Sequence, residues 1–371
     1  VTLHVADLPV SADYRRLFLD DAVFMDLRSP GEYAHGAFPG ATSLPLMTDE
    51  ERAQVGTCYK QRGQDAAIAL GHRLVAGDER ERRVAAWCEF ARRHPQGYLY
   101  CWRGGLRSQT VQQWLADEGI VYPRIEGGYK ALRRFLLEEL AHSLQQARLV
   151  LVSGRTGTGK TRVIHALQRA LDLEGMARHR GSSFGHLPEP QPSQIDFENA
   201  VSIAFLQQLA RRSGPVVLED EGRLIGRLAL PENLRQSMQQ APLLVVEESL
   251  EERVSVILDD YINDLGARYA LRHGVVEGPT LHRARLLEGL DGIRKRLGGA
   301  RHQALRATME QAFDLQCSSG DPQVHRGWIR ELLEAYYDPM YSYQLAQRDG
   351  TELFRGNRQQ VVDYARSQLS C

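Results

Sequence analysis

A cysteine on a loop rich in glycine and arginine is the first candidate for covalent chemistry in this sequence. Residues 101–108 read Cys-Trp-Arg-Gly-Gly-Leu-Arg-Ser, after an apolar run at 98–100 and before an apolar, helix-like run at 111–115. Backbone N–H groups, a helix N-terminus and guanidinium charges all favour a thiolate over a thiol. We therefore predict that Cys101 is a nucleophile beside an anion-binding loop. The predicted loop residues are Arg103, Gly104, Gly105 and Arg107.

A second glycine-bearing segment, residues 154–161, matches the phosphate-binding pattern G-x-x-x-x-G-K-[ST] at every required position. It follows an apolar run at 149–152 and precedes a helix expected to begin near Thr161. Such glycines let N–H groups converge on an anion, and Lys160 adds a full charge. The residues expected to bind a diphosphate are Gly154, Thr156, Gly157, Gly159, Lys160 and Thr161. ATP, GTP, a diphosphate ester or a phosphorylated donor would all satisfy this pattern.

Acidic residues follow another apolar run, at 216–218. In P-loop proteins a carboxylate at such a strand end holds a metal ion or orients water. We predict this role for Asp220, with Glu219 beside it, and expect Mg²⁺ between Asp220 and the hydroxyl of Thr161. A solvated acidic turn would have the same sequence.

Composition restricts the class of protein. The chain has 371 residues, of which 43% are hydrophobic and 25% charged, with a net charge of -1. These values indicate a globular protein of two or three domains. No apolar run approaches the roughly 18 residues of a membrane span. The cysteines contain no CxxC pair and predict neither a disulfide framework nor zinc, so we expect a cytoplasmic protein. They are Cys58, Cys88, Cys101, Cys317 and Cys371.

The hydrophobic pattern divides the chain near residue 130. Before that point, short apolar runs alternate with helical stretches and predict a small α/β unit, which a helix over 130–146 connects to the rest. After it, three buried-strand candidates alternate with helices, as in a parallel sheet. These candidates are 149–152, 216–218 and 243–246. From about Leu250 onward the pattern is mostly helical, and one apolar stripe there indicates core. The stripe contains Leu286, Leu290, Ile293 and Leu297.

The N-terminal third resembles the rhodanese family. Residues 26–33 and 35–41 resemble the first signature of that family, 101–107 its active loop, and 126–128 its closing segment. Trp102 departs from the pattern, because many rhodaneses carry a basic residue directly after the cysteine, and Arg103 is expected to take that place.

The whole chain resembles the bacterial tRNA 2-selenouridine synthase family, in which a rhodanese domain precedes a P-loop domain. Further similar segments are 55–61, 69–72, 127–133, 173–175, 177–182, 218–221 and 336–341. The resemblance implies an α/β fold: an N-terminal rhodanese-like α/β domain at 1–129, a connecting helix at 130–146, and a P-loop NTPase-like parallel-sheet α/β domain with a helical C-terminal part at 147–371.

The same resemblance implies the substrates. Members act on tRNA that carries 2-thiouridine at the wobble position and replace sulfur by selenium, with selenophosphate as donor. The family is also linked to S-geranylation of that base from geranyl diphosphate. On this basis we expect Cys101 to carry or deliver selenium, as a selenylated cysteine, and Arg103 and Arg107 to bind selenophosphate or phosphate. Lys160 would stabilise the leaving diphosphate, with Mg²⁺ at Thr161.

Two basic segments are candidates for contacts with tRNA phosphates. The first contains Arg178, His179 and Arg180, and the second Arg294, Lys295 and Arg296. A basic run on a solvated surface would have the same sequence. Tyr336, Tyr337 and Tyr341 are candidates for stacking on an unpaired base or, alternatively, for packing in the core.

Three other functions remain compatible with the motifs. Cys101 and Arg107 satisfy the C-x5-R pattern of a cysteine-dependent phosphatase. The P-loop is also compatible with an ATP-dependent sulfurtransferase, or with a non-enzymatic tRNA-binding regulator that uses the P-loop as a nucleotide switch.

Overall fold

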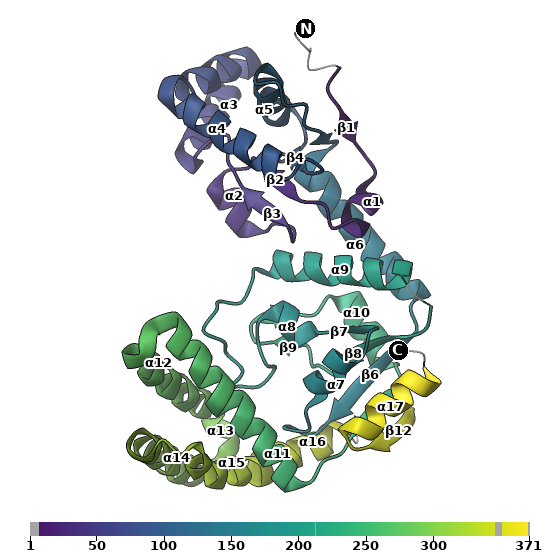
Figure 1. Ribbon diagram of the computed structural model, residues 1–371, viewed down its shortest axis with the longest axis vertical. Helices are drawn as coiled ribbons and strands as arrows, with labels where there is room; N and C mark the ends of the chain where they lie inside the picture. Colours follow the sequence, from purple (N-terminus) through teal and green to yellow (C-terminus); the bar gives the residue numbers. More distant parts are fainter. Residues whose placement is uncertain (1–6, 212, 346–350, 370–371) are drawn as a thin grey trace. The chain divides into compact units, whose positions relative to one another are not determined.

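The chain folds into two compact units, each built on a parallel β-sheet (Figure 1). The computed structural model describes residues 7–211, 213–345 and 351–369. The first unit comprises residues 1–143 and 193–210, and the second comprises 144–192 and 211–371. No helix within the described ranges is long and apolar enough to span a membrane.

The sheet of the first unit has five parallel strands in the order β1-β5-β4-β2-β3. The strands are β1 (Val10–Ser11), β2 (Phe24–Asp26), β3 (Ala41–Ser43), β4 (Tyr98–Tyr100) and β5 (Arg124–Ile125). The helices are α1 (Tyr14–Leu19), α2 (Pro30–His35), α3 (Asp49–Leu74), α4 (Gly77–Arg93), α5 (Leu106–Asp117), α6 (Gly128–Gln146) and α9 (Gln194–Arg211). Because β2, β4 and β5 are neighbours and parallel, the loops that follow them meet at one edge of the sheet.

Helix α9 packs in the first unit, although the elements before and after it in the chain belong to the second. Ile203 joins the apolar cluster that contains Phe18. The side chain of Asn199 donates a hydrogen bond to the carbonyl oxygen of Ala37 at 2.7 Å, and the N–H of Ala37 donates to Asp196 at 2.6 Å. Apolar burial and these hydrogen bonds thus hold α9 on the first unit.

The second unit has a five-stranded parallel sheet in the order β12-β11-β6-β8-β7. All six residues of β6 are buried, which is typical of a central strand covered on both faces. The strands are β6 (Leu149–Gly154), β7 (Ala170–Leu171), β8 (Val216–Glu219), β11 (Leu243–Val246) and β12 (Glu352–Gly356), with a separate hairpin of β9 (Leu224–Ile225) and β10 (Leu228–Ala229). Shorter helices are α7 (Lys160–Ala166), α8 (Leu173–Ala177), α10 (Glu232–Gln239) and α17 (Arg358–Gln368).

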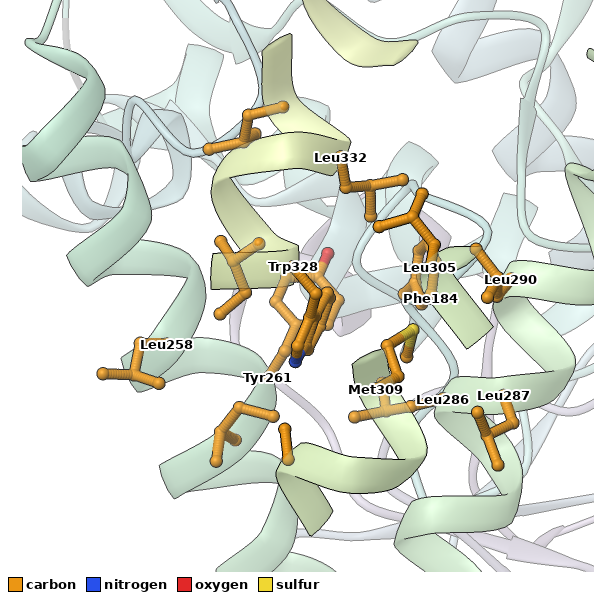
Figure 2. Close-up of a cluster of buried hydrophobic side chains, with 14 of the residues drawn as sticks. Phe184, Leu258, Tyr261, Leu286, Leu287, Leu290, Leu305, Met309, Trp328 and Leu332 are labelled. Atoms are coloured by element: carbon orange, nitrogen blue, oxygen red, sulfur yellow. The ribbon is translucent and has the colours of Figure 1, made fainter. Parts of the chain in front are cut away.

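The rest of the second unit is helical. Its elements are α11 (Leu250–Ile257), η2 (Leu258–Asp264), α12 (Leu265–Gly292), α13 (Arg294–Leu297), α14 (Gly299–Ser319), η3 (Pro322–His325), α15 (Arg326–Leu332), η4 (Leu333–Tyr337) and α16 (Asp338–Leu345). Figure 2 shows Tyr261, Trp328 and Met309 among the buried side chains that these helices share. The predicted stripe from Leu286 to Leu297 is buried in this core, as expected.

The sequence expectations hold for the α/β class and for every strand named in the second half. Two differences are informative. Strand β12 lies in the part expected to be mostly helical; it is an edge strand with several exposed residues, so no apolar run marks it. The spatial boundaries also differ from 1–129, 130–146 and 147–371, because most of α6 and nearly all of α9 belong to the first unit.

Candidate active sites

The cysteine loop, residues 101–105, joins β4 to α5 as predicted. Glycines allow a neighbouring loop to lie against it. A Cβ on Gly104 would lie 2.5 Å from the carbonyl oxygen of Ile125, and a Cβ on Gly128 would lie 2.3 Å from that of Cys101. Both glycines also have left-handed φ angles, +65° and +58°. Only glycine satisfies the conformation and the close approach together.

The side chain of Cys101 is 2% exposed and belongs to an apolar cluster that also contains Leu27 and Leu99. The loop is held through its carbonyl oxygens: Cys101 accepts from the N–H of Tyr129 at 2.9 Å, and Gly104 accepts from Nη1 of Arg124 at 3.1 Å. Ser108, in the first turn of α5, was not singled out from the sequence. Its buried hydroxyl has no hydrogen-bond partner among the described residues, so a ligand can complete it.

The two arginines predicted to bind an anion, Arg103 in the loop and Arg107 in the first turn of α5, differ in their surroundings. Arg103 is exposed. Arg107 forms an ion pair with Glu32 of α2, with Nη1 and Oε2 2.8 Å apart. Burial opposes ionisation of Glu32, but hydrogen bonds and charges led by those of Arg107 outweigh it and lower the pKa of this carboxyl to about 2. Arg107 therefore already has a counter-ion, whereas Arg103 faces solvent.

A buried arginine lies against the aromatic rings of Trp102, in the cysteine loop, and of Tyr129. Arg28, 1% exposed, donates from Nε to Oδ1 and from Nη2 to Oδ2 of Asp26 and lies with Cζ 3.7 Å from the centre of the Tyr129 ring. The Tyr129 ring in turn stacks on Trp102 at 5.3 Å. Trp102, the residue that departs from the rhodanese pattern, thus packs on a cation–aromatic cluster. The Asp-Leu-Arg signature is the sequence signal for this cluster.

The P-loop follows β6, as predicted. Nζ of Lys160 donates to the carbonyl oxygen of Gly154 at 3.2 Å. A Cβ on Gly157, whose φ is +84°, would lie 2.9 Å from the carbonyl oxygen of Arg253. On Gly154 a Cβ would lie 2.6 Å from that of Val246. The motif glycines therefore let the loop pass close to neighbouring backbone.

A buried ion pair holds the tip of the P-loop. Arg253 of α11 is 2% exposed; its Nε donates to the carbonyl oxygen of Thr156 at 2.9 Å. Its two terminal nitrogens donate to Asp338 of α16 at 3.0 and 2.5 Å, and Arg155 lies 3.7 Å from the same carboxylate. The roles of Arg253 and Asp338 were not predicted, although Asp338 lies in the similar segment 336–341.

The acidic residue nearest the P-loop hydroxyl is not the predicted one. Asp220 accepts a hydrogen bond from Ser153 at 2.7 Å. The hydroxyl of Thr161 donates instead to Glu174 of α8 at 3.2 Å. Both residues lie beyond the end of β8, where the N–H of Glu221 donates to the carbonyl oxygen of Glu219. Asp220 faces Ser153, whereas Glu221 lines the pocket with Thr161. Thr161 thus contacts Glu174 and not Asp220, and the magnesium role expected of Asp220 stays a prediction.

Carboxyl groups crowd this side of the P-loop. Burial, followed by the charges of Glu174 and other neighbouring carboxylates, raises the pKa of Glu219 well above its usual range. Burial and the neighbouring Glu174 raise the pKa of Glu221 to about 8. Glu219 is fully buried and accepts from the backbone N–H of Glu174 at 3.2 Å.

A pocket of about 510 Å³ opens over the P-loop. Gly159, Lys160, Thr161, Glu174 and Glu221 form its polar side. Leu187, Val256, Ile257, Tyr261, Tyr337 and Met340 contribute an apolar side. A larger hollow of about 740 Å³ lies at the amino ends of the strands, against Leu149 and Pro215. Ligands of parallel α/β sheets bind at the carboxyl ends, so the P-loop pocket is the candidate site.

Comparison with known proteins places the chain in a family. Residues 147–371 match the family described as the tRNA 2-selenouridine synthase AAA domain. A tRNA 2-selenouridine synthase of Marinobacter nauticus is 52% identical over 99% of this chain and 100% of its own length. Proteins of the same name from Pseudomonas putida and Pseudomonas fluorescens are 53% and 54% identical, covering 97% and 95% of this chain and 97% of each relative. The chain belongs to the tRNA 2-selenouridine synthase family.

One solved structure is also similar in sequence to part of this chain. It is the N-terminal domain of a putative ATP/GTP binding protein from Clostridium difficile 630, 32% identical, covering 34% of this chain and 98% of its own length. The TM-score is 0.30, too low to compare the folds.

The three residues of segment 178–180 that were expected to contact tRNA differ in exposure and in their partners. Arg178 is exposed. Arg180 is held by an ion pair with Asp264. His179 is 2% exposed, and burial together with His186 lowers its pKa to about 4. A neutral, buried imidazole does not attract surface phosphates, which corrects the prediction for His179.

The remaining basic and tyrosine candidates also include both exposed and buried residues. Arg294, Lys295 and Arg296 are all exposed on α13. Tyr336 and Tyr337 are buried in the helical core, so the core alternative holds for both. Tyr341 lies with its hydroxyl 3.4 Å from Oγ of Ser153. Cys58 and Cys88 are partly and fully buried, Cys317 is exposed, and Cys371 lies outside the described residues.

Proposed function

We propose that this chain modifies tRNA by converting 2-thiouridine at the wobble position to 2-selenouridine, with selenophosphate as selenium donor and S-geranylation from geranyl diphosphate as an intermediate step. The observation that carries the proposal is the match, over nearly the whole chain, to relatives named tRNA 2-selenouridine synthase. Two further features support it: a thiol on a strand–helix loop and a P-loop pocket with an apolar side.

The P-loop pocket is proposed to bind geranyl diphosphate. Its phosphate-binding loop suits the diphosphate, and its apolar side suits a hydrocarbon chain. The thiocarbonyl sulfur attacks C1 of the geranyl group, the C–O bond to the diphosphate breaks, and diphosphate leaves. Lys160 stabilises the charge that develops on this leaving group.

The cysteine loop is proposed to serve the selenium step. Cys101 delivers selenium by attack of its sulfur on the phosphorus of selenophosphate: an S–P bond forms, the P–Se bond breaks, and hydrogen selenide is released. Water then cleaves the S–P bond, which frees phosphate and restores the thiol. Loop N–H groups, Ser108 and Arg103 hold the phosphoryl group during both steps. Selenium then forms a bond to C2 of the base, the C–S bond breaks, and the geranylthio group leaves. Arg107 acts mainly by orienting the loop, because its charge is shared with Glu32.

Exposed cations are proposed to bind the tRNA backbone. Arg178 and the segment 294–296 are exposed, whereas Arg180 is held in an ion pair. Each phosphate contact makes the affinity fall as salt rises. Replacing Arg178 by alanine should therefore reduce the salt dependence of tRNA binding.

Mass analysis of nucleosides tests the proposal directly. The full chain is incubated with thiolated tRNA, geranyl diphosphate and selenophosphate, and the digest is examined for geranylated and selenated uridine. Lys160→Ala should abolish geranylation, and Cys101→Ser should abolish selenation while geranylation continues. Lys60→Ala and Cys317→Ser replace an exposed lysine and an exposed cysteine and serve as matched controls.

Each outcome bears on one part of the proposal. Normal geranylation by Lys160→Ala would refute the role of the P-loop. Selenation by Cys101→Ser would refute the role of the thiol. Hydrolysis of an aryl phosphate, or ATP hydrolysis coupled to product, would instead favour the phosphatase or the sulfurtransferase. Binding of tRNA without any modified nucleoside would indicate the regulator.

A further inference from the structure

The hydroxyl that a P-loop offers to a cation points at an unexpected carboxylate in this protein. Oγ1 of Thr161 lies 3.2 Å from Oε2 of Glu174. Glu174 comes from α8, a short helix whose N-terminal cap is Asp172. The acidic residue expected from the sequence, Asp220, is instead bound by Ser153 at 2.7 Å.

A second carboxylate converges on the same point. A Cβ on Gly181 would lie 2.4 Å from Oε1 of Glu174 and 3.1 Å from Oε2 of Glu221. Both carboxylates thus approach Gly181, which has φ of +65° and no side chain to separate them. Glu174 and Glu221 line the P-loop pocket together with Lys160 and Thr161. Two acidic side chains that approach each other this closely repel unless a cation or a proton lies with them.

An unsatisfied buried oxygen next to this pair points to a missing ligand. Glu219 has no exposed surface, and one of its carboxylate oxygens accepts from the N–H of Glu174. The other, Oε1, is buried and has no hydrogen-bond partner among the described residues. The nearby cation Lys160 bonds the carbonyl oxygen of Gly154. Buried carboxylate oxygens without partners are unfavourable, and a nearby cation would offset that cost.

The oxygen atoms of these side chains suit a hard divalent cation that also binds a ligand, and not a structural metal held by protein side chains alone. Within the described part of the chain, no three His, Cys, Asp or Glu side chains are arranged to hold a metal by themselves. Mg²⁺ typically takes one or two carboxylates and completes its shell with water and substrate phosphate oxygens. Glu174, Glu221 and Thr161 supply such an incomplete set beside the P-loop.

We propose that Glu174 and Glu221, with the hydroxyl of Thr161, form the binding site for a divalent cation of the Mg²⁺ class that enters together with the diphosphate. This rests on the proposed function only in taking a diphosphate as the P-loop ligand. Asp220 is then a structural residue that ties the end of β8 to Ser153.

Equilibrium dialysis of the full chain against Mn²⁺ and inorganic diphosphate tests the proposal. The free complex of Mn²⁺ with diphosphate reaches the same concentration on both sides of the membrane. The excess of manganese and of phosphorus on the protein side therefore gives the amount of each bound per chain. Wild type should bind both. Glu174→Gln and Glu221→Gln should weaken retention of Mn²⁺ at least about tenfold. Asp220→Asn, a matched neutralisation of the neighbouring carboxylate, should retain it.

The two counts separate this inference from the proposed function. If phosphorus is retained and manganese is not, the cation site is refuted while the P-loop assignment stands. If Lys160→Ala loses phosphorus but wild type retains both, the P-loop assignment is supported as well. If wild type retains neither, both ideas fail. Loss of manganese in Asp220→Asn alone would return the site to Asp220.

Thermal unfolding supplies a readout that does not depend on dialysis. Without divalent cations, Glu221→Gln should melt at a higher temperature than wild type, because one of the two converging carboxylates is neutral. With Mg²⁺ and inorganic diphosphate, wild type should gain more than the variant, so the difference shrinks or reverses. Equal gains in wild type, Glu174→Gln and Glu221→Gln would refute the site.

Discussion

Replacing Asp338 by asparagine should loosen the P-loop without touching its motif. Asp338 receives both terminal nitrogens of Arg253, whose side chain is 3% exposed, while Asp338 itself is 20% exposed. Breaking a buried ion pair from one side costs about 3–5 kcal/mol, because the other charge is left unpaired. Since Asp338 keeps some solvent contact and asparagine keeps one acceptor oxygen, we expect the lower end of this range.

Thermal unfolding and hydrogen exchange measure this effect. For a unit of this size each kcal/mol lowers Tm by roughly 2–4 °C, so Asp338→Asn should lower the Tm of the second unit by about 6–12 °C. Arg253 also donates to the carbonyl oxygen of Thr156. Amide exchange in residues 154–161 should therefore rise more than exchange in β11. Affinity for inorganic diphosphate should fall with it.

A matched control uses the same substitution in an exposed ion pair. Asp314 lies 2.6 Å from Arg283, and its side chain is 67% exposed. Pairs of this kind contribute less than about 1 kcal/mol, so Asp314→Asn should change Tm little. Equal Tm values for the two variants, together with unchanged exchange in the P-loop, would show that the Arg253 pair does not support this loop.

Three further predictions concern the stability of the first and the second unit. Gly128→Ala should destabilise the first unit by at least about 1–2 kcal/mol, because the left-handed φ is costly and the new Cβ would lie 2.3 Å from the carbonyl oxygen of Cys101; an unchanged urea midpoint would contradict it. Arg28→Lys should lower the same midpoint, because lysine cannot make the paired hydrogen bonds to buried Asp26; a midpoint equal to wild type would show that charge alone suffices. Burial, with a smaller effect of a second histidine, lowers the pKa of His325 to about 4. The unfolded chain therefore binds this proton first, and stability of the second unit should fall from about pH 6.5 to 4, more steeply than in His325→Gln. Equal slopes would refute this assignment.

The cysteine loop shows how far local sequence reaches. Its position after β4 and before α5 followed from an apolar run, two glycines and a helical pattern. The pairing of Arg107 with Glu32 did not follow, because it joins residues 75 positions apart. Only the parallel order of the strands brings α2 to the edge where the cysteine loop lies.

The acidic residues beside the P-loop show what local sequence does not predict. The apolar run at 216–218 correctly predicted a strand followed by carboxylates. Which carboxylate meets Thr161 depended on the side to which each one points and on Glu174, which comes from a different element. Of the two neighbours Asp220 and Glu221, only Glu221 has its side chain on the pocket side. Sequence spacing does not specify which of two successive side chains faces a pocket once the strand has ended.

The amino-acid sequence by itself determined the α/β class, the strand–loop–helix context of Cys101 and Lys160, and the family, because these depend on local periodicity, glycine positions and motif spacing. Tertiary structure decided the assignment of α9 to the first unit, the Arg253–Asp338 support of the P-loop and the convergence of Glu174 with Glu221. Each of these joins residues far apart in the chain, and their contact energies exist only once the sheets and helices have packed.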